Sequence, residues 1–280
     1  MTGIAVTKAH AYGNDFLFVA EDAVVDAAGG DPTVLARTLC ARHTGVGADG
    51  LILYRRCPGG ATMRLWNADG SASELSGNGL RCLAALVARD EGLDPADPSR
   101  RVVRVDTTAG LKTLDLLACE GPRYTFRAAM GQPEHLRQDV IQVGGEAVPV
   151  VLLNVGNPQC IVLGPLPDEV RFRAVGGALA VHPHFPEGTN VEFVQVEAPD
   201  RIRILIWERG VGPTTSSGTG SSASAVAAAA YGGAGRSVRV DAPGGSQQVE
   251  WREDGIYLTG DAEILCDAVW LPGPGAAPLL

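Results

Sequence analysis

A short sequence pattern occurs twice in this 280-residue chain and constrains its fold more than any other feature. The tetrapeptide SGNG, beginning at Ser76, is followed by LRCLAALVA, and SGTG, beginning at Ser217, is followed by SSASAVAAAA. Each copy is a small, polar, glycine-flanked turn that opens an alanine-rich helix. The two serines stand 141 positions apart (76 to 217), about half the chain. This spacing predicts two similar halves, each with one such helix.

The small residues of both helices suit burial, with strands wrapped tightly around them. Two further helices are predicted, one opened by Asp31 and Pro32, an N-cap residue followed by proline at the first helical position, and one over DEVRFRAVGGALA. Because the strands do not alternate regularly with helices, we expect an α+β fold. The strand-like runs include residues 51–54, 63–66, 102–105, 148–153, 190–196, 202–207 and 237–240.

Composition and charge exclude several classes of protein. The chain is 45% hydrophobic and 20% charged, a composition typical of a globular protein. Its 280 residues are enough for two units. Its formal charge of −9 repels phosphate backbones and anionic membranes, so neither nucleic acid nor a membrane is an expected partner. The opening MTGIAVTKAH has no apolar run, and no segment reaches the length of a membrane span, so we expect a cytoplasmic protein.

No sequence motif predicts a metal or a cofactor. The six cysteines lack paired spacing and are expected to be free thiols, mostly structural. Cys40 with His43, and the His182-Pro183-His184 run, have no further ligands nearby to complete a zinc site. The run GVGADG matches G-x-G-x-x-G, but it follows a predicted helix and precedes the strand LILY, which reverses the order of a dinucleotide site.

The repeated turn has a physical use, because unpaired backbone N–H groups and the helix dipole favour an anion at a helix start. Two halves facing each other would bring two such starts to one cleft. Asparagines also stand at the ends of predicted strands, where each alone is typical of a turn. Together with Glu208 and Arg209 they indicate a polar pocket. They are Asn14, Asn67, Asn157 and Asn190.

The chain resembles the diaminopimelate epimerase family over nearly its whole length. The motifs that carry the resemblance, in order, are HAYGNDF, RHTGVGADG, LWNADGSASELSGNGLRC, NVGNPQ, GTNVEF and WERGVGPTTSSGTG. The resemblance implies two pseudo-symmetric halves, each a mostly antiparallel β-barrel-like sheet around a central helix. We expect an N-terminal half over residues 1–120, a C-terminal half over 121–262, and a final segment, 263–280, that returns to the N-terminal half.

The same resemblance implies a cofactor-independent isomerase that converts LL- to meso-diaminopimelate, a step towards lysine and peptidoglycan. Inverting an α-carbon takes two acid/base groups, one on each face. The expected partner is a small amino acid, a diamino diacid, and a homodimer is a further expectation. The implied residues are Ser76, Ser217 and Glu208 for acid/base chemistry, Gly77, Asn78, Gly218 and Thr219 for the reacting carboxylate, and Asn14, Asn67, Asn157, Asn190 and Arg209 for the rest of the substrate and its pocket.

Departures from the family pattern fall on the chemistry. Ser76 and Ser217 stand where the family has its two catalytic cysteines, Gln159 where it commonly has histidine, and Pro213 in place of a usual glutamate. A cysteine thiol ionises near pH 8.5, and serine is several units less acidic. Three hypotheses stay open: an epimerase of low activity, a lyase or double-bond isomerase that uses a single group such as Glu208, and a substrate-binding homologue impaired in catalysis.

Overall fold

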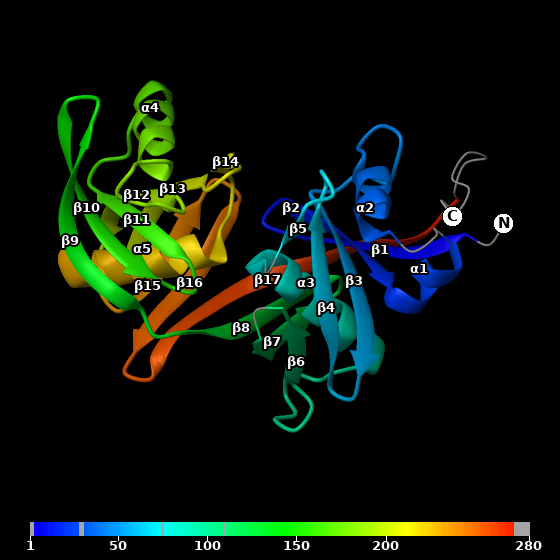
Figure 1. The fold of residues 1–280 in the computed structure, drawn as a ribbon. Coiled ribbons are helices and arrows are strands. Elements are labelled where there is room, and N and C mark those ends of the chain that lie inside the picture. The colour runs from blue at the N-terminus through cyan, green and yellow to red at the C-terminus, as the bar shows by residue number, and fades with distance from the viewer. Residues whose placement is uncertain (1–2, 28–30, 74–75, 109, 272–280) are drawn as a thin grey trace. The chain divides into compact units, whose positions relative to one another are not determined.

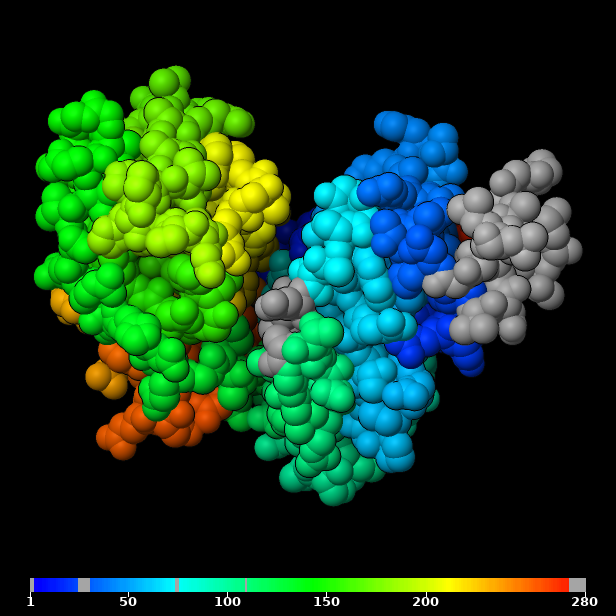
Figure 2. All heavy atoms as spheres, viewed as in Figure 1, coloured from blue at the N-terminus to red at the C-terminus, as the bar shows by residue number. Residues whose placement is uncertain are grey.

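The computed structural model describes residues 3–27, 31–73, 76–108 and 110–271 (Figure 1). They form two compact units. The N-terminal unit runs to Arg127 and includes the strand residues from Asp261 onward, and the C-terminal unit is Ala128–Gly260. Figure 2 shows the heavy atoms of both units in the same view and chain colours. Two long strands, β8 (Arg123–Gly131) and β17 (Gly255–Trp270), have residues in both units.

The N-terminal unit is a mostly antiparallel sheet with three helices. Its strands hydrogen-bond in the order β7, β6, β4, β3, β2, β1, β17, with parallel pairing at β2/β3 and β4/β6. The elements are β1 (Ile4–Ala11), β2 (Asn14–Ala20), α1 (Glu21–Ala27), α2 (Pro32–Cys40), β3 (Gly50–Cys57), β4 (Gly60–Asn67), β5 (Ala72–Ser73), α3 (Gly77–Glu91), β6 (Val102–Thr107) and β7 (Gly110–Glu120).

The C-terminal unit repeats this plan. Its strands run in the order β9, β10, β11, β12, β13, β15, β16, β17, with parallel pairing at β11/β12 and β13/β15. The elements are β9 (Glu134–Val143), β10 (Glu146–Asn154), β11 (Pro158–Leu163), α4 (Glu169–Ala180), β12 (Asn190–Ala198), β13 (Arg201–Glu208), β14 (Gly212–Thr214), α5 (Gly218–Tyr231), β15 (Ser237–Ala242) and β16 (Gly245–Arg252).

Each unit makes its parallel strand pairs through helices, since parallel neighbours need a long crossover. In the N-terminal unit α3 joins β4 and β5 to β6, and in the C-terminal unit α5 joins β13 and β14 to β15. The two connections are equivalent and begin at the two repeated turns. The predicted α+β fold with two pseudo-symmetric halves is therefore confirmed.

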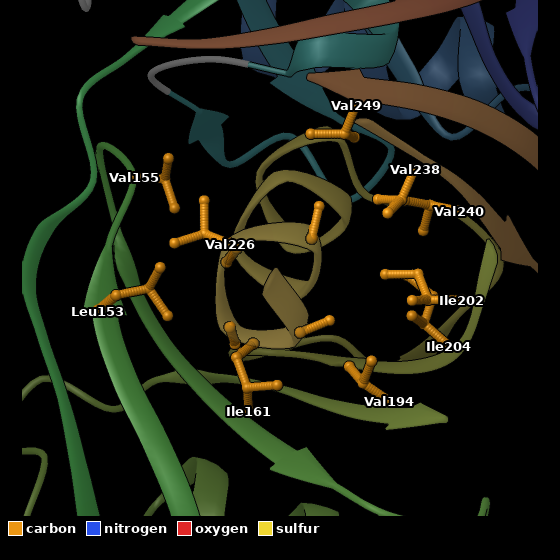
Figure 3. Packing of buried hydrophobic residues seen from close by; sticks show 14 of the residues in the cluster. Leu153, Val155, Ile161, Val194, Ile202, Ile204, Val226, Val238, Val240 and Val249 are labelled. Atoms are coloured by element: carbon orange, nitrogen blue, oxygen red, sulfur yellow. The ribbon is translucent and has the colours of Figure 1, made fainter. Parts of the chain in front are cut away.

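Both repeated helices are the central, buried helices of their units. Helix α3 contacts β1, β2, β4, β6 and β7, and α5 contacts β10, β11, β12, β13, β15 and β16. Apolar side chains from the surrounding strands converge on Val226 of α5, among them Leu153, Val194 and Ile202 (Figure 3). The alanines of α5 let these strands approach closely, because a larger side chain would hold them away.

The predicted helices and strand runs are confirmed. Asp31 caps α2 by accepting from the backbone N–H of Thr33 at 2.9 Å, and Asp168 caps α4 in the same way through Arg171. The GVGADG loop follows α2 and precedes β3, whereas the loop of a dinucleotide site follows a strand and precedes a helix. The sequence did not predict every strand. One unpredicted strand, β9, is exposed or only partly buried along most of its length, so it lacks a run of buried apolar residues.

The described residues contain no cluster of three or more histidine, cysteine or acidic side chains that could hold a metal ion. All six cysteines are free, and three of them are exposed: Cys57, Cys119 and Cys266. Within the described part of the chain, no helix is long and apolar enough to cross a membrane.

We predict that α5 tolerates added volume only at its exposed end. Ala227 is fully buried, so Ala227→Leu should lower the free energy of unfolding by about 1–3 kcal/mol through overpacking. Ala230, on the same helix, is exposed, and Ala230→Leu should change it by about 0.5 kcal/mol or less. Urea denaturation of both variants measures the difference, and equal effects would contradict a tightly enclosed helix.

Candidate active site

Ser76 is the N-cap of α3. Its backbone is extended (φ −126°, ψ 122°), and its Oγ accepts the backbone N–H of Gly79 at 3.1 Å. The carbonyl of Ser76 accepts from Leu80 N at 2.8 Å, as in the first regular turn of a helix. The N–H groups of Gly77 and Asn78 come before this point and have no partner within the helix, so they remain suited to an anion.

Ser217 caps α5 with nearly the same geometry. Its backbone angles are φ −143° and ψ 127°, and its Oγ accepts the N–H of Gly220 at 3.1 Å. The carbonyl of Ser217 accepts from Ser221 N at 3.0 Å. The sequence repeat is thus a structural repeat, with one serine hydroxyl and one set of helix-start N–H groups in each unit.

Asn14 and Asn78 lie together beside the Ser76 turn. The Asn78 amide donates to the Asn14 side-chain oxygen at 3.2 Å, and the Asn14 amide donates to Asp49 at 2.9 Å. Asn78 is almost fully buried. The structure therefore brings two of the predicted site residues into one hydrogen-bonded row and adds Asp49, which the sequence analysis did not single out.

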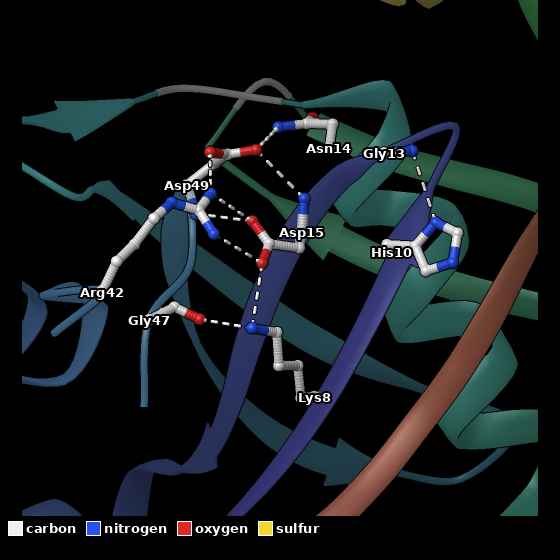
Figure 4. A network of polar contacts seen from close by, with 8 residues as sticks. All are labelled: Lys8, His10, Gly13, Asn14, Asp15, Arg42, Gly47 and Asp49. Atoms are coloured by element: carbon white, nitrogen blue, oxygen red, sulfur yellow. Dashed lines mark hydrogen bonds and ion pairs between the residues drawn. The ribbon is translucent and has the colours of Figure 1, made fainter. Parts of the chain in front are cut away.

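Asp49 belongs to a charged network at the base of this row (Figure 4). Arg42 bridges Asp49 at 2.7 Å and Asp15 at 3.0 Å, and Lys8 pairs with Asp15 at 3.0 Å. Burial tends to raise the pKa of Asp15, but hydrogen bonds from Arg42 and Lys8 hold that pKa below its usual value. This network fixes Asp49, and Asp49 in turn holds the Asn14 amide.

A buried cation adjoins the first turn of α3. Arg81 is 1% exposed, donates to the Asn78 side-chain oxygen, and lies over the Tyr12 ring at 5.7 Å. Burial lowers the pKa of Arg81, and Tyr12 opposes that shift. Its Nε has no hydrogen-bond partner among the described residues. Arg81 could not be predicted from the sequence, because it stands inside an apolar helical run, LRCLAALVA, where periodicity gives no sign of its partners.

Asn67 is also a predicted site residue, and its side chain contacts a residue close to it in the sequence. It lies exposed at the end of β4, and its amide donates to Ser71 Oγ at 2.9 Å across the turn that leads to β5. This is the turn role that an isolated asparagine usually has.

In the C-terminal unit, Asn157 and Thr219 lie beside Ser217. The Asn157 amide donates to Thr219 Oγ1 at 3.4 Å, and that hydroxyl is also 3.4 Å from Ser217 Oγ. Gly218, the first residue of α5, is buried and directly follows Ser217. Thus three of the predicted residues of this half, Asn157, Gly218 and Thr219, adjoin the capping serine.

Asn190 fixes the backbone of Arg209. The Asn190 side-chain oxygen accepts the backbone N–H of Arg209 at 2.9 Å, and the Arg209 guanidinium donates to the Glu187 carbonyl at 2.9 Å. Both predicted residues therefore occupy one corner of the unit, where β12 begins and β13 ends.

Two carboxyl groups lie near the start of α5. Burial raises the pKa of Glu208 above its usual 4.5, and a hydrogen bond with the Ser217 side chain opposes that shift. Glu192, which the sequence analysis did not single out, is fully buried. A Cβ atom added to Gly220 would lie 2.5 Å from Glu192 Oε1, so the carboxyl reaches the first turn of α5.

The arrangement offers hydroxyl groups at two helix starts, with a different electrostatic setting in each unit. Ser76 lies in the unit that buries the Arg81 cation, and Ser217 contacts the Glu208 carboxyl. Pro213 is exposed on β14, and no contact there assigns it a role. A carboxylate next to a serine hydroxyl can accept its proton.

Comparison with known proteins agrees with this architecture. The family model described as Diaminopimelate epimerase matches residues 6–136 and 151–265. A diaminopimelate epimerase of Desulforudis audaxviator is 40% identical over 283 residues, covering 95% of this chain and 98% of that protein. One from Pelotomaculum thermopropionicum is 37% identical, covering 92% and 95%.

A solved structure supports the fold. The crystal structure of a probable proline racemase from Agrobacterium radiobacter superposes with a TM-score of 0.70 at 19% identity, covering 97% of this chain and 94% of that one.

Glycine at the third position of α5 is predicted to matter more than its counterpart in α3. In Gly220→Ala the new Cβ meets the enclosed Glu192 carboxyl at 2.5 Å, whereas in Gly79→Ala it meets the terminal methyl group of Ile52 at 2.8 Å. Both substitutions replace glycine by alanine at the third position of a helix, so the gain in helix propensity is the same in each and cancels in the comparison. Displacing a buried polar group should cost about 1–3 kcal/mol more than shifting the methyl group.

Urea denaturation of the two glycine variants, each compared with the wild-type protein, measures this difference. Equal losses of the free energy of unfolding would show that Glu192 is free to move away from Gly220.

Proposed function

The chain belongs to the diaminopimelate epimerase family, and on that premise we propose that it inverts one α-carbon of diaminopimelate, converting the LL isomer to the meso isomer. The observation that supports this most directly is the pair of matched helix starts capped by Ser76 and Ser217. An isomerase of this kind needs one acid/base group for each face of the α-carbon, and the repeat supplies one in each unit.

The helix starts would hold the reacting carboxylate. The N–H groups of Gly77 and Asn78 in one unit, and of Gly218 and Thr219 in the other, are the first of their helices. Such groups favour an anion, and they favour it more as charge develops on the substrate during removal of the α-proton.

The remaining amides and the guanidinium would hold the far end of the substrate. Asn67, Asn157 and Asn190 offer donors and acceptors that suit an ammonium and a carboxylate, and Arg209 can bind a carboxylate with two hydrogen bonds. Asn14 would line the same pocket. The bond from Asn190 holds the backbone of Arg209, and the Glu187 carbonyl accepts from its guanidinium, which supports a defined position for that side chain.

Glu208 would compensate for the weak basicity of serine at the C-terminal position. As Ser217 Oγ takes the α-proton, its own proton passes to the Glu208 carboxylate, and the carbanion takes a proton from the Ser76 hydroxyl on the other face. Ser76 is left as an alkoxide, which regains a proton from solvent, and Glu208 returns its proton to solvent. The hydrogen bond between Ser217 and Glu208 supports this relay.

The homodimer and the cytoplasmic location stay predictions.

We predict slow exchange of the α-proton of LL-diaminopimelate for deuterium. Protonation of Glu208 should set the decrease in the exchange rate at low pH. Because burial raises the pKa of Glu208, the carboxylate that accepts the proton is lost as the pH falls through a value above 4.5, and exchange falls with it. Glu208→Gln should lower the rate by about 10²-fold or more. Proton NMR in heavy water, from pH 4 to pH 8 for both proteins, measures the rates.

Absence of exchange at high enzyme concentration, with substrate binding intact, would reject the proposed function and favour a binding protein. Loss or shift of a double bond, followed by absorbance with hydroxy and unsaturated acids, would favour the lyase or double-bond isomerase instead.

Restoring both thiols should increase epimerisation. In Ser76→Cys/Ser217→Cys each helix start would hold a group whose pKa of about 8.5 is several units below that of a serine hydroxyl. We expect the exchange rate of the double variant to exceed the wild-type rate by about 10²-fold or more, with each single variant gaining less. No gain in the double variant, at unchanged stability, would show that the chain has adopted a different reaction.

A further inference from the structure

Glu192 is a carboxyl group enclosed by the protein and left without a cation. It lies on β12 between Ile161 of β11 and Ile206 of β13, and its exposure is 0%. No ion pair reaches it from any lysine, arginine or histidine among the described residues. A carboxylate with neither water nor a counter-ion is strongly unfavourable in a protein interior, so the group must gain a proton or a partner.

Gln159 contacts Glu192 in either orientation of its amide. With Nε2 turned towards Asn157, the Gln159 oxygen lies 3.0 and 3.1 Å from the two carboxyl oxygens. Two oxygens at that separation form a hydrogen bond only when one of them carries a proton. With the amide reversed, Nε2 donates to Glu192, and the oxygen accepts from the Asn190 amide at 3.2 Å.

The charged surroundings favour the protonated form. The titratable group that acts on Glu192 is Glu208, from β13, and Glu192 in turn raises the pKa of the Cys160 thiol on β11. Burial, and then repulsion from Glu208, raise the pKa of Glu192 well above its usual 4.5. Glu208 is less enclosed and contacts the Ser217 hydroxyl, which favours its charged form. When one proton is shared between these two carboxyls, it therefore belongs on Glu192.

We propose that Glu192 is a positioning residue of the C-terminal site, which stays protonated at neutral pH, orients Gln159 towards Asn157, and leaves the negative charge of the pair on Glu208. The geometry that supports this is the enclosed carboxyl, its oxygen contact with Gln159, and its place against Gly220 in the first turn of α5. From Gln159 the contacts continue through Asn157 and Thr219 to Ser217.

The proposal has a chemical consequence for the base. A neutral Glu192 adds no negative charge beside Glu208, which favours the Glu208 carboxylate that accepts the Ser217 proton. An ionised Glu192 would oppose that charge. It would also turn the Gln159 amide away from Asn157. The effect on proton transfer rests on the proposed function, whereas the proton on Glu192 does not.

Infrared spectroscopy of the full chain in heavy water at pH 7 tests the proton directly, because a protonated carboxyl absorbs separately from a carboxylate. We expect such a band in the wild-type protein and in Glu208→Gln, and its loss in Glu192→Gln. Glu146→Gln, at an exposed carboxyl paired with Arg171, is the matched control and should leave the band unchanged. Absence of the band in the wild-type protein, or its persistence in Glu192→Gln, would overturn the proposal.

A pH titration of the same band tests the coupling to Glu208. Removing the charge of Glu208 removes the repulsion that keeps the proton on Glu192, so in Glu208→Gln the band should disappear at a lower pH than in the wild-type protein. An unchanged titration would overturn the assignment of the negative charge to Glu208.

Activity measurements separate the two proposals. If positioning through Gln159 matters, Glu192→Gln, which keeps a polar hydrogen-bonding group, should retain about tenfold more α-proton exchange than Glu192→Leu. Equal rates in the two variants would reject the positioning role while leaving the proposed epimerisation intact. A wild-type protein with the infrared band but no exchange would instead reject the function.

Discussion

A helix enclosed by strands on all sides has to satisfy its first N–H groups without bulk water, and this requirement determines the rest of each unit. Serine meets it at both central helices, because its Oγ accepts the N–H three residues on while its backbone stays extended. The glycines that follow let the chain turn tightly and allow other groups to come close, as Glu192 does at Gly220. Two N–H groups at each start are then left for an anion.

The same requirement explains why a serine hydroxyl fits the fold at both positions. A capping hydroxyl is a good acceptor for a backbone N–H, and serine is among the residues favoured at an N-cap. The cost falls on proton transfer, since a hydroxyl ionises far less readily than a thiol. The Glu208 carboxyl contacts the Ser217 hydroxyl, which places a proton acceptor next to the capping serine of α5.

The sequence predicted the parts of the fold that depend on local pattern. Capping residues such as Asp31, Ser76 and Ser217 mark helix starts by their own side chains, so they could be read directly. Arg81 and Glu192 could not, because their significance lies in distant partners that only the folded chain assembles. Glu192 shows why: β12 has α4 packed on one face and α5 on the other, so neither face of an apparently alternating strand meets solvent.

Repetition of the turn does not make the two helix starts chemically equivalent. In the N-terminal unit the position five residues after the capping serine is Arg81, a buried cation that donates to Asn78. The corresponding position in the C-terminal unit is Ser222, whose hydroxyl donates to the carbonyl of Gly218, and the ionisable groups there are carboxyls. A buried cation stabilises negative charge beside Asn78 in the first turn of α3, whereas the carboxyls near Ser217 oppose negative charge and can accept a proton. Two copies of one turn therefore differ in their electrostatic surroundings through residues outside the repeated tetrapeptide.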